Sequence, residues 1–445
     1  MHIDRRRFVQ GALGASCALA SPLRAEGPKA SGVYIGDMHS HLFFFGMGAS
    51  PQQKPLGATM AAGNATLVAW SLVGDVPWLR VTGKGIKQKG SPKKGEPGKW
   101  LDDDVARIKE HLASQNLKLV LTPDDVDKAL AGEPHVVLTV EGATFVEDGI
   151  APLAHVYEQG VRSVQLVHYI DNPLGDFQTE APQHDGLTEL GREVIAECNR
   201  LGILVDLAHC TDKAVRQALD VAAQPVIWSH SSVTRTRTPN WKMPVWQARQ
   251  LSFDTAKLIA DKGGVVGLWP MRSDVGVTPE AYARRLWELS EWLGDDHAGF
   301  GTDMNAISRT AIASYADLQK VVRYWQKAGV PAASVHKLAI GNYARVLKAA
   351  MSARARSSRH PARLDVILGL VPRTHGSACS VHRRSGSTHD LSLEQVEGWV
   401  LGLKPRMTPK RPAACGAPQV VALSDHPLTR LSRCARPADL SPWER

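Results

Sequence analysis

The chain reads Val33-Tyr34-Ile35-Gly36-Asp37-Met38-His39-Ser40-His41 near its amino-terminal end. Its first half is apolar and β-branched, which favours a buried strand. Two histidines follow, and alternation along an extended chain places both imidazoles on the same side. The stretch therefore predicts a strand, Val33–Asp37, that ends in a pair of candidate metal ligands, His39 and His41.

Seven further apolar runs follow this strand and alternate with helical patterns. They are Thr66–Val73, Val136–Val140, Ser163–Val167, Ile203–Leu207, Val226–Ser229, Val265–Leu268 and Gly299–Gly301. Mostly continuous apolar runs are typical of parallel strands that are covered on both faces. Alternation of strands and helices predicts an α/β fold, and eight strands favour a closed (β/α)₈ TIM barrel over an open sheet.

Helical periodicity separates most of these strands. The clearest case is Glu189–Leu201, where Thr188 is a candidate N-cap and Gly202 a candidate stop. Other helices are expected near residues 102–114, 152–159, 212–222, 252–262, 279–293, 315–328 and 333–349. Residues 81–99 are rich in Lys and Gly and predict an exposed loop or insertion.

Chemically capable side chains stand at the ends of six strands. Besides His39 and His41 they are Glu141, His168, His209, His230 and Asp303. In a (β/α)₈ barrel the carboxyl ends of the strands build the active site, so these side chains are expected to converge. Neutral imidazole and carboxylate suit Zn²⁺, and a carboxylate that bridges two metals leaves another free for acid–base work.

Each of these residues also has a structural explanation when it is taken alone. A single strand-end histidine is more often hydrogen-bonded or solvated than metal-bound, and His168 could simply pack against Tyr169. The joint pattern favours a metal site. No HExxH, GxSxG, P-loop or Gly-rich dinucleotide turn is present. Cys210 adjoins His209 but faces the opposite way along a strand, so a core thiol is expected there.

At these residues the chain resembles the membrane dipeptidase (renal dipeptidase) family of amidohydrolase-like enzymes. The resemblance spans residues 33–350. Matching stretches are Gly36–His39, Thr139–Gly142, Gly160–His168, Gly186–Gly202, Val205–His209, Ser229–Ser232, Gly301–Asp303 and Gly341–Val346.

The resemblance implies a barrel with two zinc ions. His39 and the residue two positions later would bind one ion, His209 and His230 the other, and Glu141 would bridge them. His168 would contact the substrate or stabilise the tetrahedral intermediate. Asp303 would exchange protons with the bridging water or contact the substrate amine.

Two departures from the family pattern bear on specificity. The family usually has His-x-Asp where this chain has His39-Ser40-His41. Its substrate-carboxylate arginine follows the second-metal histidine by several residues and precedes an Asn. Here Arg237 or Arg235 is the candidate, since a guanidinium suits bidentate carboxylate capture.

The expected function is that of a zinc-dependent dipeptidase in which a metal-activated hydroxide attacks the amide carbonyl of a short peptide. Alternatives are another amidohydrolase activity, on lactones, N-acyl amino acids or other amides and esters, and a non-catalytic barrel. The partner is expected to be a small molecule or dipeptide. Family members are often dimers, which leaves a homodimer open.

Charge argues against a nucleic-acid partner. The chain carries a net +9, but residues 351–445 hold 15 Lys and Arg against 7 Asp and Glu, and residues 1–25 hold 4 against 1. The stretch between them therefore carries −2, and the basicity lies at the ends rather than on the core.

The two ends predict separate segments. Arg5-Arg6-Arg7-Phe8-Val9 and a short apolar run resemble a twin-arginine export signal over residues 1–25, so a periplasmic or secreted protein is expected, without a transmembrane anchor. The catalytic domain is expected over residues 31–350. Residues 351–445, rich in Arg, Pro and Ser, predict a disordered tail or an out-of-frame translation.

Overall fold

A computed structural model describes residues 32–41, 56–83, 85–307 and 309–359 of the chain. The expected export signal and the chain after Arg359 lie outside the described residues, so those predictions remain predictions. Within the described residues, no helix combines the length and the apolar character that a bilayer crossing requires.

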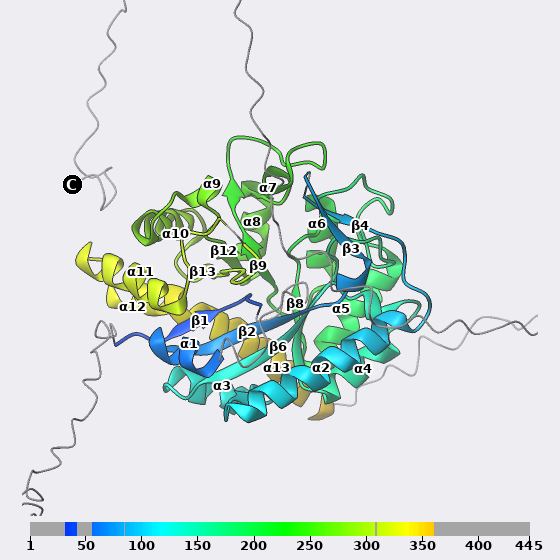
Figure 1. Ribbon diagram of the computed structural model, residues 1–445, viewed down its shortest axis with the longest axis horizontal. Coiled ribbons are helices and arrows are strands. Elements are labelled where there is room, and N and C mark those ends of the chain that lie inside the picture. Colours follow the sequence, from blue (N-terminus) through cyan, green and yellow to red (C-terminus); the bar gives the residue numbers. More distant parts are fainter. Residues whose placement is uncertain (1–31, 42–55, 84, 308, 360–445) are drawn as a thin grey trace, which may run out of the picture.

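Eight parallel strands form the centre of the molecule (Figure 1). In spatial order they are β1 (Ile35–Asp37), β2 (Ala65–Val73), β6 (His135–Glu141), β7 (Val161–Gln165), β8 (Leu204–Asp206), β9 (Ile227–Ser231), β12 (Val265–Leu268) and β13 (Ala298–Phe300). The Met38 N–H donates to the Phe300 carbonyl at 3.0 Å, which joins the end of β1 to β13. The barrel is nearly closed, and the predicted (β/α)₈ fold is confirmed.

All eight predicted strands are present, and their ends differ from the predicted ends by no more than two residues. A short strand, β5 (Lys118–Leu119), pairs with β6 outside this order. Another short parallel pair, β10 (Val233–Thr234) and β11 (Leu251–Ser252), lies apart from the barrel sheet.

Helices cover the outside of the barrel. The longer ones are α1 (Leu56–Ala62), α2 (Glu96–Ser114), α3 (Pro123–Leu130), α4 (Ala151–Glu158), α5 (Glu189–Leu201), α6 (Asp212–Val221), α8 (Phe253–Asp261), α10 (Pro279–Leu293), α11 (Tyr315–Lys327) and α13 (Asn342–Arg359). Short ones are η3 (Val76–Trp78), η4 (Thr144–Val146), α7 (Val245–Ala248), α9 (Arg272–Val275), α12 (Ala332–His336) and η5 (Lys337–Gly341).

Helix α5 has the ends that the sequence predicts. The Thr188 hydroxyl accepts a hydrogen bond from the Gly191 N–H, and Gly202 ends the helix with a φ of +79°. Glycine tolerates this left-handed conformation without a Cβ penalty. Capping and the apolar stripe together fix the helix between β7 and β8.

Helix α13 contacts both the barrel strands β1, β8, β12 and β13 and the outer helices α3 and α5. Its Tyr343, Val346 and Leu347 belong to the same buried cluster as Met38 after β1 and Leu204 of β8. The helix continues to Arg359, past residue 350 where the sequence predicts the domain to end. Its first residues therefore help to fill the barrel core, and its later turns extend beyond the predicted boundary.

Residues 79–88 differ from the sequence prediction. The predicted loop over residues 81–99 contains most of an antiparallel hairpin, β3 (Leu79–Thr82) and β4 (Gly85–Gln88), and the first turn of α2. Leu79 and Ile86 of the hairpin pack with Tyr169 and Ile170, which follow β7. This apolar contact holds the hairpin against the loop that carries His168.

Two glycines allow neighbouring strands to approach closely beside His230. A Cβ on Gly267 or on Gly301 would lie 1.9 or 1.8 Å from the Ser229 carbonyl oxygen. No side chain fits at such a distance, so both positions require glycine. The close approach places β12 and the end of β13 against the residue that precedes His230.

Candidate metal centre and active site

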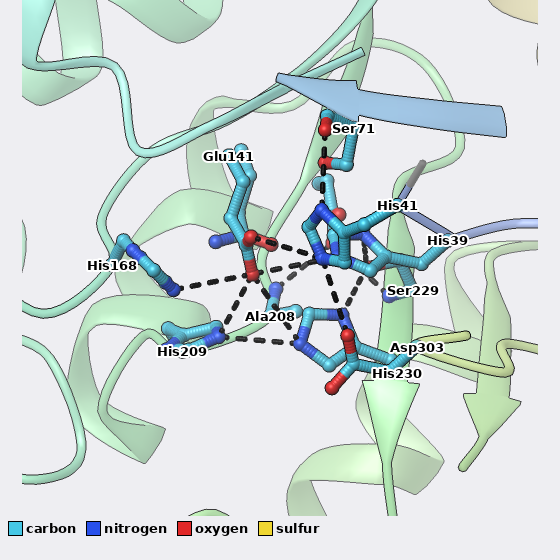
Figure 2. Close-up of polar contacts among 12 residues, drawn as sticks. His39, His41, Ser71, Glu141, His168, Ala208, His209, Ser229, His230 and Asp303 are labelled. Atoms are coloured by element: carbon cyan, nitrogen blue, oxygen red, sulfur yellow. Dashed lines mark hydrogen bonds and ion pairs between the residues drawn. The ribbon is translucent and has the colours of Figure 1, made fainter. Parts of the chain in front are cut away.

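Side chains from the ends of six strands meet at one end of the barrel (Figure 2). His39 and His41 follow β1, Glu141 ends β6, His168 follows β7, His209 follows β8, His230 lies in β9 and Asp303 follows β13. The structure therefore brings together the residues that the sequence predicts for metal binding and catalysis.

Glu141 lies at the centre of this cluster and is only 2% exposed. Its Oε1 lies 3.4 Å from His39 Nε2, 3.4 Å from His168 Nε2, 3.3 Å from His209 Nε2 and 3.6 Å from His230 Nε2. Its Oε2 lies 3.5 Å from His41 Nε2 and accepts no hydrogen bond from the described residues. A buried carboxylate oxygen without a donor is costly, which points to a cation as its natural partner.

Hydrogen bonds on the far sides of the rings orient two of the histidines. His41 Nδ1 lies 3.2 Å from the Ser71 carbonyl oxygen, and His230 Nδ1 lies 2.9 Å from Ser229 Oγ. A carbonyl only accepts, so Nδ1 of His41 carries the proton and a neutral ring keeps its Nε2 lone pair for the centre.

The charges suit a bound cation. Burial lowers the pKa of His209 and His230 well below the ordinary value, so both rings are neutral. Burial raises the pKa of Glu141, but the imidazoles of His168 and His39 outweigh it and hold that pKa well below its usual range. Burial lowers the pKa of His39, yet the Glu141 carboxylate outweighs it and raises the pKa to about 9. A cation would displace that proton.

The spacing of the donor atoms also fits a small metal ion. Zinc–ligand bonds of about 2.0–2.1 Å place neighbouring corners of a tetrahedron roughly 3.3 Å apart. His39 Nε2 and His41 Nε2 are 3.1 Å apart, and His209 Nε2 and His230 Nε2 are 3.2 Å apart. Each pair thus matches two ligands of one ion, with Glu141 between the pairs.

Asp303 is held beside the first pair. Its Oδ1 lies 3.2 Å from His41 Nε2, and its N–H donates to the His39 carbonyl at 2.9 Å. Asp303 and His209 both have positive φ, +46° and +71°. Such backbone conformations cost energy in residues other than glycine and cluster at functional sites.

Two buried carboxylates behind the histidines were not singled out by the sequence. Asp37 accepts from the N–H of Thr302 at 2.9 Å and from that of His39 at 3.3 Å. Asp206 accepts from the N–H groups of Ala208 and Ser229 at 2.9 and 3.0 Å. Both tie neighbouring strand ends together. An Asp two or three positions before a strand-end His was the signal available for both.

A third buried carboxylate, Asp75, orients His168. Asp75 Oδ1 lies 2.7 Å from His168 Nδ1, and its Oδ2 accepts from the Tyr169 N–H at 3.1 Å. Burial lowers the pKa of His168, but Asp75 and Glu141 together outweigh it and raise that pKa. His168 therefore does more than pack against Tyr169. Asp75 lies just after β2, where the sequence analysis placed no chemistry.

A cavity of about 860 Å³ opens directly above the cluster. Its wall includes His41, Glu141, His168, His209, His230 and Asp303, together with Tyr169, Trp269 and Arg249. The two cysteines of the described residues lie elsewhere. Cys198 and Cys210 are buried, and burial raises the pKa of both thiols, so Cys210 is a core thiol as predicted.

A profile of the membrane dipeptidase family, peptidase family M19, matches residues 102–360. This chain belongs to the membrane dipeptidase family. The matched range contains Glu141, His168, His209, His230 and Asp303, and the β1 histidines precede it.

Similar proteins agree with this assignment. The chain is 29% identical to the dipeptidase tcpJ of Claviceps purpurea over 55% of its own length and 58% of that protein. It is 32% identical to an uncharacterised dipeptidase of Schizosaccharomyces pombe over 48% of its own length and 54% of that protein. The matches thus span little more than half the length of these relatives.

Solved structures share the fold. A metallopeptidase of Rhodobacter sphaeroides, solved with a phosphinate mimic of the dipeptide L-Ala-D-Ala, is 20% identical with a TM-score of 0.59. The probable dipeptidase PvdM of Pseudomonas aeruginosa is 15% identical with the same TM-score. The alignments cover 72% of this chain in both cases, and 99% and 96% of those chains.

The resemblance implies an Asp at position 41, where this chain has a histidine. The His41 imidazole faces Glu141 and Asp303. An imidazole there supplies no carboxylate charge, and the Asp303 carboxylate lies 3.2 Å from its Nε2.

The structure places the two predicted carboxylate-binding arginines away from the main cavity. Arg235 lies over the rings of Phe253 and Trp292, and Arg237 donates to Gln250 Oε1 at 2.6 Å. Neither residue lines the main cavity. A long loop follows β10 and leads through α7 to β11, so Arg235 and Arg237 lie at the start of this loop.

Arg249 is the arginine that reaches the centre. It is 1% exposed, and its Nη2 lies 3.0 Å from His230 Nε2. A guanidinium only donates, so this contact uses the lone pair that a metal at His230 would take. Arg249 is followed by Gln250, a side-chain amide, and an arginine next to an amide was the available signal.

Proposed function

We propose that this chain is a zinc-dependent dipeptidase that binds two metal ions. The observation that carries the proposal is Glu141, a buried carboxylate surrounded by five imidazoles at the base of a cavity that Arg249 also lines. His39 and His41 would hold one ion, His209 and His230 the other, and Glu141 would bridge them. Bound zinc would supply Lewis acidity that polarises the amide carbonyl and acidifies water.

Asp303 is the proton carrier in this proposal. It faces the cavity beside His41. Unlike Glu141, it is not surrounded by imidazoles. It would accept a proton from the attacking water and deliver it to the leaving amine. Its left-handed backbone, fixed by the hydrogen bond to the His39 carbonyl, sets its direction before substrate binds.

His168 is the proposed donor to the oxygen of the tetrahedral intermediate. Asp75 accepts a hydrogen bond from Nδ1, and Asp75 and Glu141 raise the pKa of the ring, which favours a proton on Nε2 as well, toward Glu141 and the cavity. A positioned cationic donor stabilises negative charge that develops on the carbonyl oxygen. Removal of a donor of this kind typically costs about 10²–10³ in rate.

Arg249 is proposed to bind the α-carboxylate of the dipeptide. Its guanidinium is buried, has no carboxylate partner within the described residues, and lies at the cavity beside the proposed second metal pair. A buried guanidinium matches a carboxylate with two parallel hydrogen bonds. This places the C-terminal residue of the substrate near Arg249 and the free amine toward Asp303.

Metal analysis with a substrate panel tests the proposal. Purified protein is expected to contain about two zinc ions per chain and to hydrolyse dipeptides. His209→Ala should lose metal and activity, whereas His155→Ala, an exposed histidine on α4, should keep both. Activity confined to lactones or N-acyl amino acids would assign another amidohydrolase function, and a folded, metal-free wild-type chain would assign a non-catalytic barrel.

A further inference from the structure

A second cavity adjoins the first and is used by none of the steps above. It has a volume of about 800 Å³ and shares Gly85, Val245 and Trp246 with the main cavity. The hairpin β3–β4 and helix α7 meet at this boundary, on the upper side of Figure 1. A Cβ on Gly85 would lie 2.6 Å from Val245 Cγ2, so glycine is needed for the two elements to touch.

The second cavity lies on the Arg249 side of the centre. Ala248, which lines it, directly precedes Arg249 in the chain. Thr179, which also lines it, directly follows Gln178, and the Gln178 side chain accepts a hydrogen bond from Arg249. A substrate whose carboxylate meets Arg249 therefore has its C-terminal residue next to this cavity.

One wall of the second cavity is large and apolar, while the rest of the lining is small or polar and includes Thr179 and Lys242. Trp241, Met243, Pro244 and Trp246 come from one stretch of chain, and Trp241 is 41% exposed at the rim. Lys87 and Glu180 also line the cavity, but they form an ion pair of 2.5 Å and offset each other's charge. Rings and thioethers of this kind favour contact with an aromatic group.

Size separates the roles of the two cavities. Pockets for drug-sized ligands have volumes of about 300–1,000 Å³, so the main cavity, at about 860 Å³, is large enough by itself for such a ligand. A small dipeptide fits there without the second cavity. The additional space is therefore available to a side chain rather than to the peptide backbone.

We propose that the second cavity is a subsite for the side chain of the C-terminal residue, and that it selects dipeptides ending in a large aromatic residue. The inference rests on the proposed function, because that function places the carboxylate at Arg249. The apolar wall would remove the aromatic ring from water, and the shared boundary at Trp246 would guide it in from the main cavity.

Binding of two stable analogues tests the subsite separately from catalysis. The zinc-loaded enzyme is titrated calorimetrically with reduced-amide analogues of Ala-Trp and Ala-Ala, which cannot be hydrolysed. The Ala-Trp analogue is expected to bind at least about tenfold more tightly, since a buried aromatic side chain contributes that much or more. Trp241→Ala should reduce this preference about fivefold and leave the affinity for the Ala-Ala analogue unchanged.

A filling variant and a matched control complete the design. Met243→Trp narrows the second cavity and should also reduce the preference, while Val81→Ala, exposed on the same hairpin but lining neither cavity, should not. Equal affinity for both analogues, or a preference that neither Trp241→Ala nor Met243→Trp alters, overturns the subsite.

Hydrolysis of Ala-Ala is measured in parallel. It tests the proposed dipeptidase activity and does not test the subsite. Cleavage of Ala-Ala without a preference in binding overturns the subsite and leaves the dipeptidase standing. If the Ala-Trp analogue binds more tightly but no dipeptide is cleaved, the subsite is supported as a binding site and the proposed dipeptidase activity is contradicted. Failure of both analogues to bind overturns the subsite together with its placement at Arg249.

Discussion

Arg249 shows how much one residue decides about the substrate. It is the buried arginine in contact with the metal-binding cluster, while Arg235 is stacked on aromatic rings away from the cavity. The two arginines follow the same strand, β9, and both precede helix α8. They therefore form a matched pair for a test of carboxylate recognition.

We expect Arg249→Lys to raise the KM for dipeptides about 10- to 100-fold, because a lysine cannot reproduce the two parallel hydrogen bonds of a guanidinium. Arg235→Lys should leave KM unchanged. The measurement is kcat and KM on a dipeptide and on the same dipeptide with its carboxylate amidated. The amidated substrate should lose its dependence on Arg249. A KM increase in Arg235→Lys instead of Arg249→Lys would restore the assignment from the sequence.

His39 gives a residue-scale prediction about pH. The Glu141 carboxylate outweighs burial and raises the pKa of this imidazole to about 9 in the metal-free chain. At neutral pH the ring therefore carries a proton that must leave when a metal binds. Zinc affinity should rise with pH up to about 9, and calorimetry at pH 7 in buffers of different ionisation enthalpy should report proton release. Zinc uptake with no proton exchange would contradict this protonation state.

At the scale of elements, strands were predicted more completely than anything else. The eight barrel strands are buried on both faces, so continuous apolar runs such as Val265–Leu268 identify them without reference to other parts of the chain. Since the ends of parallel strands lie at one end of a barrel, the convergence of the candidate metal-binding residues could be predicted from their positions at strand ends.

Elements that depend on distant contacts were missed. The hairpin β3–β4 looks like a polar loop because only Leu79 and Ile86 pack, and their partners Tyr169 and Ile170 lie far along the chain. Arg249 was missed for a similar reason. The local sequence does not show that a long loop separates β10 from β11, nor that its last residues return to the centre. Asp75 became recognisable only when β2 and β7 placed it beside His168.

Helix α3, also unpredicted, depends on its first turn. Asp125 accepts from the N–H groups of Leu121 and Thr122 at 3.1 and 2.9 Å and from the Thr122 hydroxyl at 2.9 Å. Burial raises the pKa of Asp125, but hydrogen bonds from Lys128 and Thr122 outweigh it and lower that pKa below the ordinary value of 3.8. The neighbouring Asp124 is exposed and has none of these bonds, so it is a natural control.

Asp125→Ala should lower the free energy of unfolding by about 1 kcal/mol and speed hydrogen exchange of the α3 amides, because the helix loses its cap. Asp124→Ala should have a smaller effect. Since the folded-state pKa of Asp125 is depressed, its contribution is present above about pH 4 and is lost as pH falls further. Urea unfolding at about pH 6 and pH 3 tests this. An undiminished difference at pH 3 would show that the charge plays no part.

At the scale of the whole molecule, the candidate centre joins parts of the chain that are far apart. His39 and Asp303 are separated by most of the barrel's sequence, yet the Asp303 N–H donates to the His39 carbonyl. Glu141 contacts imidazoles that belong to four other strand ends. In the metal-free chain, these imidazoles are held close together mainly by the barrel and by the hydrogen bonds of Asp37 and Asp206 to the strand ends.

Metal binding should therefore stabilise the entire barrel rather than one loop. A ligand that binds only the folded state stabilises it by about 4 kcal/mol at a thousand times its Kd, which should raise Tm by several degrees in a chain of this size. Chelation should lower the Tm of the zinc-loaded protein, and restoring zinc should reverse the loss. Glu141→Gln removes the bridging charge and should reduce the difference between the two states, whereas His155→Ala should preserve it. Equal melting of zinc-loaded and chelated wild type, with zinc shown to be bound, would mean that the strand ends are held in place without the metal. The centre would then be preorganised entirely by the hydrogen bonds of Asp37, Asp75 and Asp206.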